Sequence, residues 1–378
     1  MRDIVILGST GSIGVQALEV IAANPELFRV VGLSAGGNNL TLLAKQVRDF
    51  NVPIVGVSSG AQELKSSLSG VKVIDGSGAS EQIASLTCDL VLNAITGSIG
   101  LAPTLAALAS GNKVALANKE SLVAGGDLVM AYGSEKIIPV DSEHSALFQA
   151  MSAGRVSDVS KLILTASGGP FRDRQDLSKV KLADALAHPT WSMGPVVTIN
   201  SATLVNKGLE IIEAHYLFDI AYSKIEAVIH PQSIVHSLVE FKDGSTLAQA
   251  SPPDMKGPIA YALAYPNRVG GAMAPINWNG KQSWDFEPID EKRFPAVQLA
   301  RRAGALGSSV AAIYNAANEV AVAAFMKEEI AFTAIVDTIE KVVDKLSASA
   351  PSRIRDISDV SAIEQDARIY AREVLEKG

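Results

Sequence analysis

The chain has 378 residues, of which 48% are hydrophobic and 19% charged, and its net charge is −7. This composition excludes a wholly disordered protein, the acidic balance argues against a nucleic-acid partner, and the length predicts two or three domains. No secretory signal precedes the first apolar run, the apolar runs fall short of the ~20 residues of a membrane-spanning helix, and Cys88 is the single cysteine. We therefore expect a cytoplasmic protein without a membrane partner.

The first third of the chain is typical of a dinucleotide-binding fold. An apolar run at residues 4–7 stops at the glycine turn GSTGSIG (residues 8–14), and a helical segment follows. A strand, a glycine turn and a helix N-terminus in this order can bind a pyrophosphate through free N–H groups. The spacing is G-x-x-G-x-x-G rather than G-x-G-x-x-G, so a tight turn without a ligand is the alternative. A doubly wound parallel sheet is predicted from further apolar runs at residues 28–33, 54–57, 71–74, 90–93, 114–117 and 137–140.

The segment after the second of these strands bears on the choice of cofactor. Residues 34–39 are small or polar and include no carboxylate. Sites that prefer NAD place Asp or Glu at this point to bind the ribose 2′-hydroxyl. The sequence therefore favours NADP over NAD.

Charged and amide side chains follow the strand at residues 114–117. Asn118, Lys119, Glu120 and Ser121 come directly after it. Such groups at the end of a buried strand are costly unless they meet ligands or one another. A helix-capping turn would need only one of them, so this segment is a candidate functional site.

The strand at residues 137–140 runs into Asp141, Ser142 and Glu143. In extended chain, Asp141 and Glu143 would point to the same face, ~6.6 Å apart along the strand. Paired carboxylates suit a hard divalent ion such as Mg²⁺ or Mn²⁺. The alternative is a helix N-terminus, in which Asp141 is the cap and Glu143 favours the helix dipole.

The middle of the chain combines a glycine turn, a loop and a charged helix. The turn at residues 166–171 could bind an anion. The loop at residues 188–195 carries Trp191 and is either a lid that excludes water or a loop that Trp191 pins to the core. A helix is predicted over residues 201–218 with Ser201 as its N-cap. The predicted core stripe comprises Val205, Leu209, Ile212 and Tyr216, and the opposite side carries Asn206, Lys207, Glu210 and Glu213.

Two interpretations of the polar side of this helix are open. Ser201, Asn206 and Lys207 near its start would favour a phosphate, and Glu210 one turn further on could supply a third carboxylate to a metal. The alternative is an ordinary solvated helix face. Further along the chain, the sequence assigns no role to His230 or His236.

Together these segments resemble the 1-deoxy-D-xylulose 5-phosphate reductoisomerase family. The matching strings are GSTGSIG (8–14), ANKESLV (117–123), PVDSEH (139–144), SGGPF (167–171), WSMG (191–194), SATLVNKGLEIIEAHYLF (201–218) and HPQSIVH (230–236). The resemblance implies an NADPH-dependent rearrangement and reduction of 1-deoxy-D-xylulose 5-phosphate to 2-C-methyl-D-erythritol 4-phosphate in non-mevalonate isoprenoid biosynthesis. The substrate would be a small phosphorylated sugar, and the protein a homodimer.

The resemblance also implies a role for individual residues. A divalent metal (Mn²⁺, Mg²⁺ or Co²⁺) would bind Asp141, Glu143 and Glu210, with Lys119 beside it as a further catalytic residue. Substrate-binding positions would be Lys119, Ser142, Glu143, Ser167, His188, Trp191, Ser201, Asn206, Lys207 and Glu210. NADPH-binding positions would be Thr10, Gly11, Ser12, Ile13, Gly36, Asn38, Asn118, Glu120 and Gly194.

The expected architecture is α/β: an N-terminal Rossmann-type doubly wound parallel sheet, an α/β catalytic domain and a C-terminal helical bundle. We expect an NADPH-binding domain over residues 1–141, a catalytic domain with metal, phosphate and lid over 142–264, a linker over 265–290 and a helical domain over 291–378. Asn315, Asn318 and Glu319 in the last of these could touch a ligand, although helix-surface polarity is favoured. The alternatives to this function are a metal-free NADP dehydrogenase of the semialdehyde or homoserine type and a non-catalytic NADPH-binding regulator.

Overall fold

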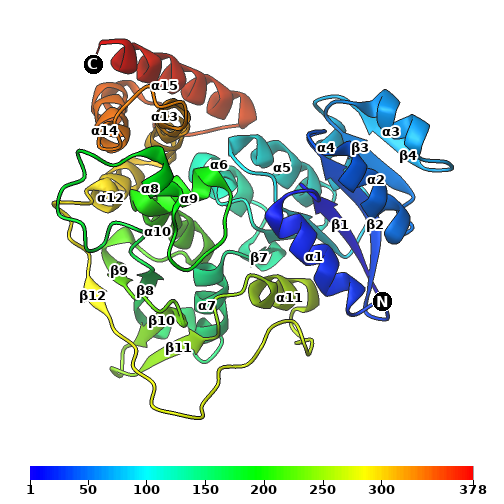
Figure 1. Cartoon of the computed structure of the whole chain (residues 1–378), viewed down its shortest axis with the longest axis horizontal. Helices are drawn as coiled ribbons and strands as arrows, with labels where there is room; N and C mark the ends of the chain where they lie inside the picture. Colours follow the sequence, from blue (N-terminus) through cyan, green and yellow to red (C-terminus); the bar gives the residue numbers. More distant parts are fainter. Residues whose placement is uncertain (378) are drawn as a thin grey trace. The chain divides into compact units, whose positions relative to one another are not determined.

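The structure is a computed structural model that describes residues 1–377. Its internal contacts divide the chain into two compact units. Unit 1 comprises Met1–Ser121, Val129–Ser145 and Asp254–Ala274. Unit 2 comprises Leu122–Leu128, Ala146–Pro253 and the chain from Pro275 onward. Each unit has its own sheet (Figure 1).

The sheet of unit 1 is parallel and, within residues 1–377, seven-stranded in the order β4-β3-β2-β1-β5-β6-β7 (Figure 1). Ile4 to Leu7 in the central strand are fully buried, because helices cover both faces of such a sheet. The expected doubly wound fold is confirmed, with each strand within about two residues of its predicted position. The strands are β1 (Arg2–Leu7), β2 (Phe28–Ala35), β3 (Ile54–Val57), β4 (Lys72–Asp75), β5 (Leu90–Asn93), β6 (Lys113–Leu116) and β7 (Ile137–Pro139).

The helices of unit 1 come mostly from the first third of the chain, with one from much later. That late helix, α11, packs on α1, and the ion pair between Lys256 and Glu19 (2.7 Å) joins the two. Arg2 adds hydrogen bonds to the carbonyl oxygens of Leu263 (3.0 Å) and Tyr265 (2.7 Å). The elements are α1 (Ser12–Ala22), α2 (Leu40–Asp49), α3 (Ala61–Ser67), α4 (Ala79–Ala84), η1 (Ser98–Gly100), α5 (Leu101–Ala109), η2 (Ser134–Lys136) and α11 (Lys256–Ala264), while α6 (Glu120–Met130) and α7 (Ser142–Met151) each continue into unit 2.

Unit 2 contains a mixed sheet, five-stranded within the described residues, in the order β11-β10-β8-β9-β12. β8 and β9 are parallel, and the other neighbours are antiparallel. The strands are β8 (Val159–Ala166), β9 (Ile225–Ile229), β10 (Val235–Phe241), β11 (Thr246–Ala250) and β12 (Glu287–Pro288). The helices are η3 (Val156–Asp158), α8 (Leu182–Leu186), α9 (Pro195–Ala202), α10 (Val205–Phe218), η4 (Tyr222–Lys224), α12 (Ala296–Leu306), α13 (Ser308–Met326), α14 (Ala334–Leu346), η5 (Ser347–Ser349) and α15 (Ile357–Lys377).

The last four α-helices pack together (Figure 1, yellow to red), as the predicted helical bundle requires. By length and hydropathy, α13 is the one helix of residues 1–377 that could cross a membrane, and 78% of its apolar window is buried inside the protein. The prediction of surface polarity for Asn315 and Asn318 is wrong, because both side chains are buried against neighbouring helices. Asn315 donates to Glu319 (3.2 Å), which pairs with Arg368 of α15 (2.7 Å).

The single helix predicted over residues 201–218 is wrong in one respect: the structure has two helices. Leu204, between α9 and α10, is left-handed (φ 58°), and this conformation ends α9. The first N–H of α10, that of Val205, is satisfied by the Thr203 hydroxyl (3.3 Å). Ser201 is therefore in the last turn of α9 and is not an N-cap.

His230 has a structural role that the sequence did not reveal. Its Nε2 accepts hydrogen bonds from the N–H groups of Ile234 (3.1 Å) and Val235 (3.0 Å). Nδ1 therefore carries the proton and donates to the Asp285 carbonyl oxygen (2.8 Å). The ring also stacks on Phe286 (4.6 Å between centroids). His230 thus ties the segment before β12 to the turn between β9 and β10.

Candidate active site

Asp141 and Glu143 lie where the chain of unit 1 leaves β7. The expectation of extended chain here is wrong: β7 ends at Pro139 and α7 begins at Ser142. Asp141 directly precedes the helix, as in the helix-terminus alternative, and its carbonyl oxygen accepts the Ser145 N–H (2.8 Å). Its carboxylate accepts the Ser142 N–H (3.0 Å). A carboxylate oxygen of Asp141 nevertheless lies within 4.8 Å of one of Glu143. Both predicted ligands are thus close enough to share a cation.

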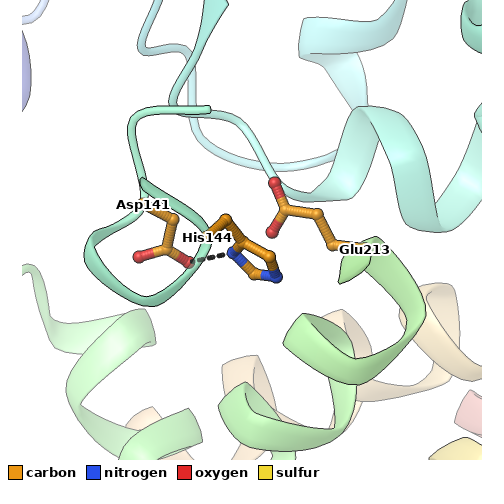
Figure 2. A group of neighbouring side chains, drawn as sticks. All are labelled: Asp141, His144 and Glu213. Atoms are coloured by element: carbon orange, nitrogen blue, oxygen red, sulfur yellow. Dashed lines mark ion pairs between the residues drawn. The ribbon is translucent and has the colours of Figure 1, made fainter. Parts of the chain in front are cut away.

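The Asp141 carboxylate is held ionised by two basic neighbours. Its Oδ2 lies 2.7 Å from the Lys119 ammonium and 3.7 Å from His144 Nδ1 (Figure 2). Burial alone would raise the pKa of Asp141, but the Lys119 charge, with a smaller contribution from His144, outweighs it and holds the pKa far below its usual range. An ionised carboxylate is the form that binds a metal.

His144 is a contact that sequence reasoning missed. It is fully buried and is three residues after Asp141 in the first turn of α7. Side chains three residues apart share a helix face. The i, i+3 spacing in PVDSEH would have revealed the pair if α7 had been placed at Ser142.

Polar residues that follow β6 form hydrogen bonds mainly with one another and with nearby backbone. The Asn118 amide donates to the carbonyl oxygens of Ile95 (2.6 Å) and Gly97 (2.9 Å) and to Glu120 (2.9 Å). Its oxygen accepts the Ser121 N–H (3.0 Å). These groups meet one another and fix the turn that presents Lys119. Contacts of Asn118 and Glu120 with NADPH remain predictions.

The glycine turn of unit 1 has the geometry of a phosphate-binding loop. Gly8 is left-handed (φ 77°), and a Cβ on Gly14 would lie 2.4 Å from the Gly8 oxygen. The first residue before α1, Gly11, provides no side-chain cap, so the helix N-terminus is open to a ligand. Thr10, Ser12 and Ile13 belong to this turn and are half-buried or exposed, and Gly36 and Asn38 are exposed after β2.

The turn after β8 in unit 2 brings two predicted phosphate ligands together. Gly168 and Gly169 are both left-handed (φ 84° and 64°), and the Gly169 N–H donates to the Ser167 hydroxyl (3.2 Å). A Cβ on Gly169 would lie 2.9 Å from the Ser201 oxygen. The turn therefore packs against the end of α9, where Ser201 is located.

The loop that begins at His188 is attached to Ser167. His188 Nδ1 accepts the N–H groups of Thr190 (3.1 Å) and Trp191 (2.9 Å). Nε2 therefore carries the proton and donates to Ser167 Oγ (3.0 Å). The half-buried Trp191 ring packs edge-on against His236 (6.1 Å), and Gly194, the last residue of the loop, is exposed. Whether this loop moves as a lid remains a prediction.

Lys207, Glu210 and Glu213 of α10 are buried and Asn206 is half-buried, so the solvated-face interpretation is wrong. The side chains of Lys207 and Glu210 are only 3% and 1% exposed and form an ion pair. Lys207 also donates to the Thr165 carbonyl oxygen, and the Asn206 amide donates to Glu210. Glu213, one turn further along α10, is equally buried (Figure 2). Buried charges are costly to desolvate, which favours a ligand-binding role for this cluster.

We expect the His188 contacts to be lost at acid pH. Burial, assisted by the Arg172 charge, lowers the pKa of His188, and protonation would place a proton on the nitrogen that accepts the two loop N–H groups. Because the folded-state pKa is below the unfolded value of ~6.5, this stabilisation is complete above that pH and is lost as pH falls through the lowered pKa.

The variants His188→Asn and His188→Gln test this directly. We expect the substrate KM of the wild type to rise at acid pH. His188→Asn keeps an acceptor for the loop and does not titrate, so this rise should disappear. His188→Gln keeps the donor to Ser167 but loses the acceptor, so its KM should be about tenfold higher at all pH values. Substrate KM measured against pH for all three proteins checks this, and an unchanged acid limb in His188→Asn would contradict it.

A dinucleotide-type sheet with a lysine-paired carboxylate beyond its last strand fits a metal-dependent oxidoreductase. Three family models match the chain. They are 1-deoxy-D-xylulose 5-phosphate reductoisomerase over residues 4–126, the C-terminal domain of that enzyme over 137–218, and the DXP reductoisomerase C-terminal domain over 250–370. The chain therefore belongs to the 1-deoxy-D-xylulose 5-phosphate reductoisomerase family.

Relatives and solved structures agree along the whole chain. The 1-deoxy-D-xylulose 5-phosphate reductoisomerase of Kitasatospora griseola is 53% identical, over 98% of this chain and 99% of the relative. The enzyme of Mycobacterium marinum is 55% identical, over 94% of this chain and 89% of the relative. A DOX-P reductoisomerase structure in complex with NADPH, fosmidomycin and magnesium superposes with a TM-score of 0.93 at 35% identity, covering 100% and 98%. The NADPH complex of the Zymomonas mobilis enzyme superposes with a TM-score of 0.92 at 39% identity, covering 99% of each chain.

Proposed function

We propose that this protein converts 1-deoxy-D-xylulose 5-phosphate to 2-C-methyl-D-erythritol 4-phosphate, with NADPH as reductant and a divalent metal. The observation that carries the proposal is the full-length match to enzymes of this name, including structures in complex with NADPH and magnesium. The ion pairs Lys119–Asp141 in unit 1 and Lys207–Glu210 in unit 2 support it, since a metal-free dehydrogenase would not need them.

We propose Asp141, Glu143 and Glu210 as the metal ligands. Their oxygen donors suit Mg²⁺, Mn²⁺ or Co²⁺, and the proximity of the first two and the low pKa of Asp141 support this assignment. When bound, the ion would supply Lewis-acid polarisation of substrate oxygens during the carbon rearrangement. Lys119, paired to Asp141, would donate a hydrogen bond to a substrate oxygen.

The remaining roles concern binding. We propose that the substrate phosphate is bound by Ser167, Ser201, Asn206 and Lys207, with Ser142 at the sugar and His188 and Trp191 in the loop that excludes water. Since Ser167 Oγ already accepts from His188 and Gly169, its own proton is available to a phosphate oxygen. NADPH, bound at the glycine turn of unit 1, would supply the hydride. Its proposed contacts are Thr10, Gly11, Ser12, Ile13, Gly36, Asn38, Asn118, Glu120 and Gly194.

The test is NADPH oxidation, followed by absorbance, with 1-deoxy-D-xylulose 5-phosphate and with Mn²⁺, Mg²⁺ or chelator. We expect substrate-dependent oxidation that stops when the metal is removed and returns when it is restored. Turnover that is indifferent to chelator would favour the metal-free dehydrogenase. NADPH binding without turnover under any metal would favour the regulator.

We also propose a homodimer and the four-part division of residues 1–141, 142–264, 265–290 and 291–378. An exposed apolar surface on the segment before β12 supports the dimer. The Trp278 side chain is 65% exposed and that of Phe286 is 44% exposed. The ring centroids of Trp278 and Trp284 are 5.8 Å apart. Light scattering should give twice the chain mass for the wild type and a larger monomer fraction for Trp278→Ser.

We further infer a cytoplasmic location. The single cysteine supports it, because proteins of oxidising compartments commonly contain disulfides. Fractionation of cells that express the protein would test this inference.

A further inference from the structure

Arg293 is attached to the backbone of a loop far away in the sequence. Its Nη1 donates to the Arg174 carbonyl oxygen (2.8 Å) and its Nη2 to the Arg172 carbonyl oxygen (2.7 Å). Its Nε lies 3.3 Å from the Asp290 carboxylate, and the side chain is largely buried. The planar fork of a guanidinium can hold two carbonyl groups in a fixed relation, which an ammonium cannot do. All these residues belong to unit 2.

The loop that Arg293 holds has little regular structure of its own. It follows β8, and its consecutive glycines, Gly168 and Gly169, are both left-handed. Outside a helix or sheet, backbone carbonyls need other partners. Phe171 provides one anchor, because it is 2% exposed and packs edge-on against Phe332 (5.1 Å). The Arg293 guanidinium provides the second anchor, at residues 172–174, directly after Phe171.

A chain of contacts leads from Arg293 to Ser167. The Arg172 guanidinium donates to the Ser167 carbonyl oxygen (3.3 Å), and the Arg172 carbonyl is one of the two groups that Arg293 holds. The Ser167 hydroxyl is in turn fixed by Gly169 and His188. A displacement of the backbone at Arg172 would therefore shift the Ser167 hydroxyl and the loop that His188 begins.

We infer that Arg293 is a positioning residue for recognition of the substrate's phosphate monoester. It would act through the backbone of residues 172–174, without touching the phosphate, by setting the position of Ser167. This inference rests on the proposed function, in which Ser167 binds the phosphate. By this inference a residue of the predicted helical domain, Arg293, contributes to the affinity for substrate.

The test compares Arg293→Met and Arg293→Lys with a matched control, Arg302→Met. Arg302 is an ion-paired arginine of the same unit that bonds to Asp344 of α14 and to no part of the Ser167 loop. We expect Arg293→Met to raise the substrate KM about tenfold, while kcat falls less than threefold and the KM for NADPH is unchanged. Arg293→Lys, which can reach one carbonyl, should give an intermediate KM. Arg302→Met should resemble the wild type.

An equilibrium titration without NADPH separates this inference from the proposed function. Arg293→Met should bind 1-deoxy-D-xylulose 5-phosphate about tenfold more weakly than the wild type, but unphosphorylated 1-deoxy-D-xylulose equally well. An unchanged affinity for the phosphorylated sugar would overturn the inference, as would equal weakening of both sugars or a parallel loss of NADPH binding and melting temperature. If Arg293→Met does not fold, the same criteria apply to Arg293→Lys. Failure of wild-type turnover would instead count against the proposed function.

Discussion

Replacement of Glu210 by Gln is expected to lower metal-dependent NADPH oxidation about 10³-fold, which corresponds to ~4 kcal/mol in the barrier. The amide keeps the size of the side chain but removes the charge that we propose as the third metal ligand. The activity should be measured at saturating Mn²⁺ and again over a range of Mn²⁺ concentrations. NADPH binding, followed by fluorescence, should be unaffected, because Glu210 is in unit 2 and the glycine turn is in unit 1.

The buried ion pair of Glu210 with Lys207 calls for controls on stability. Removal of one partner from such a pair can cost ~3–5 kcal/mol, so the melting temperature must be measured beside activity. Glu210→Asp keeps the charge and withdraws the carboxylate by one methylene, and it should also lose most activity while melting closer to the wild type. Glu319→Gln, which removes a charge paired with Arg368 in the helical bundle, should keep full activity. Full activity in a folded Glu210→Gln enzyme would remove Glu210 from the metal site.

Gly14→Ala is expected to have the second large effect, on NADPH binding. The new Cβ would lie 2.4 Å from the Gly8 oxygen and 2.6 Å from the Ser9 Cα. Both neighbours are backbone, so the glycine turn must shift, at a cost of ~3 kcal/mol. The higher helix propensity of alanine offsets only ~1 kcal/mol. NADPH affinity should fall at least about thirtyfold, and equilibrium titration of NADPH measures this.

Gly36→Ala is the matched control for this variant. Gly36 also lies beyond a strand of the same sheet, but a Cβ there meets nothing within 4 Å. Its structural cost should therefore be below ~0.5 kcal/mol, and any loss of NADPH affinity would report contact with the cofactor itself. Equal affinity in Gly14→Ala and the wild type would show that the turn can yield and that its tightness is not needed for binding.

The parallel sheet could be predicted because its strands are apolar on both faces. Runs such as residues 54–57 and 90–93 match their strands to the residue. The break at Leu204 could not be predicted, because a leucine in the left-handed conformation contradicts its local preference and is imposed by packing. The start of α7 was missed because two carboxylates at alternate positions suit a strand end and a helix N-terminus equally well.

The site residues were predictable to different degrees. Individual polar groups at strand ends and on α10 could be found from the pattern, but the proposal that they form one metal and phosphate site came from family resemblance. The burial of Lys207 and Glu210 was not visible in the sequence, since the same spacing also describes a solvated helix face. Arg293 carries no motif, and its contacts with Arg172 and Arg174 exist only in the folded chain.

The return of α11 to α1 has a consequence for biosynthesis. Synthesis proceeds from the N-terminus, and domains generally fold as units as they emerge. Here the first unit is completed only when residues 254–274 have left the ribosome, because the Glu19–Lys256 pair and the Arg2 contacts with Leu263 and Tyr265 join the start of the chain to that late segment. A nascent chain of 145 residues would have its whole parallel sheet and still expose the surface of α1 that α11 covers. Unit 1 therefore begins the chain but can finish folding only after about 270 residues have been synthesised.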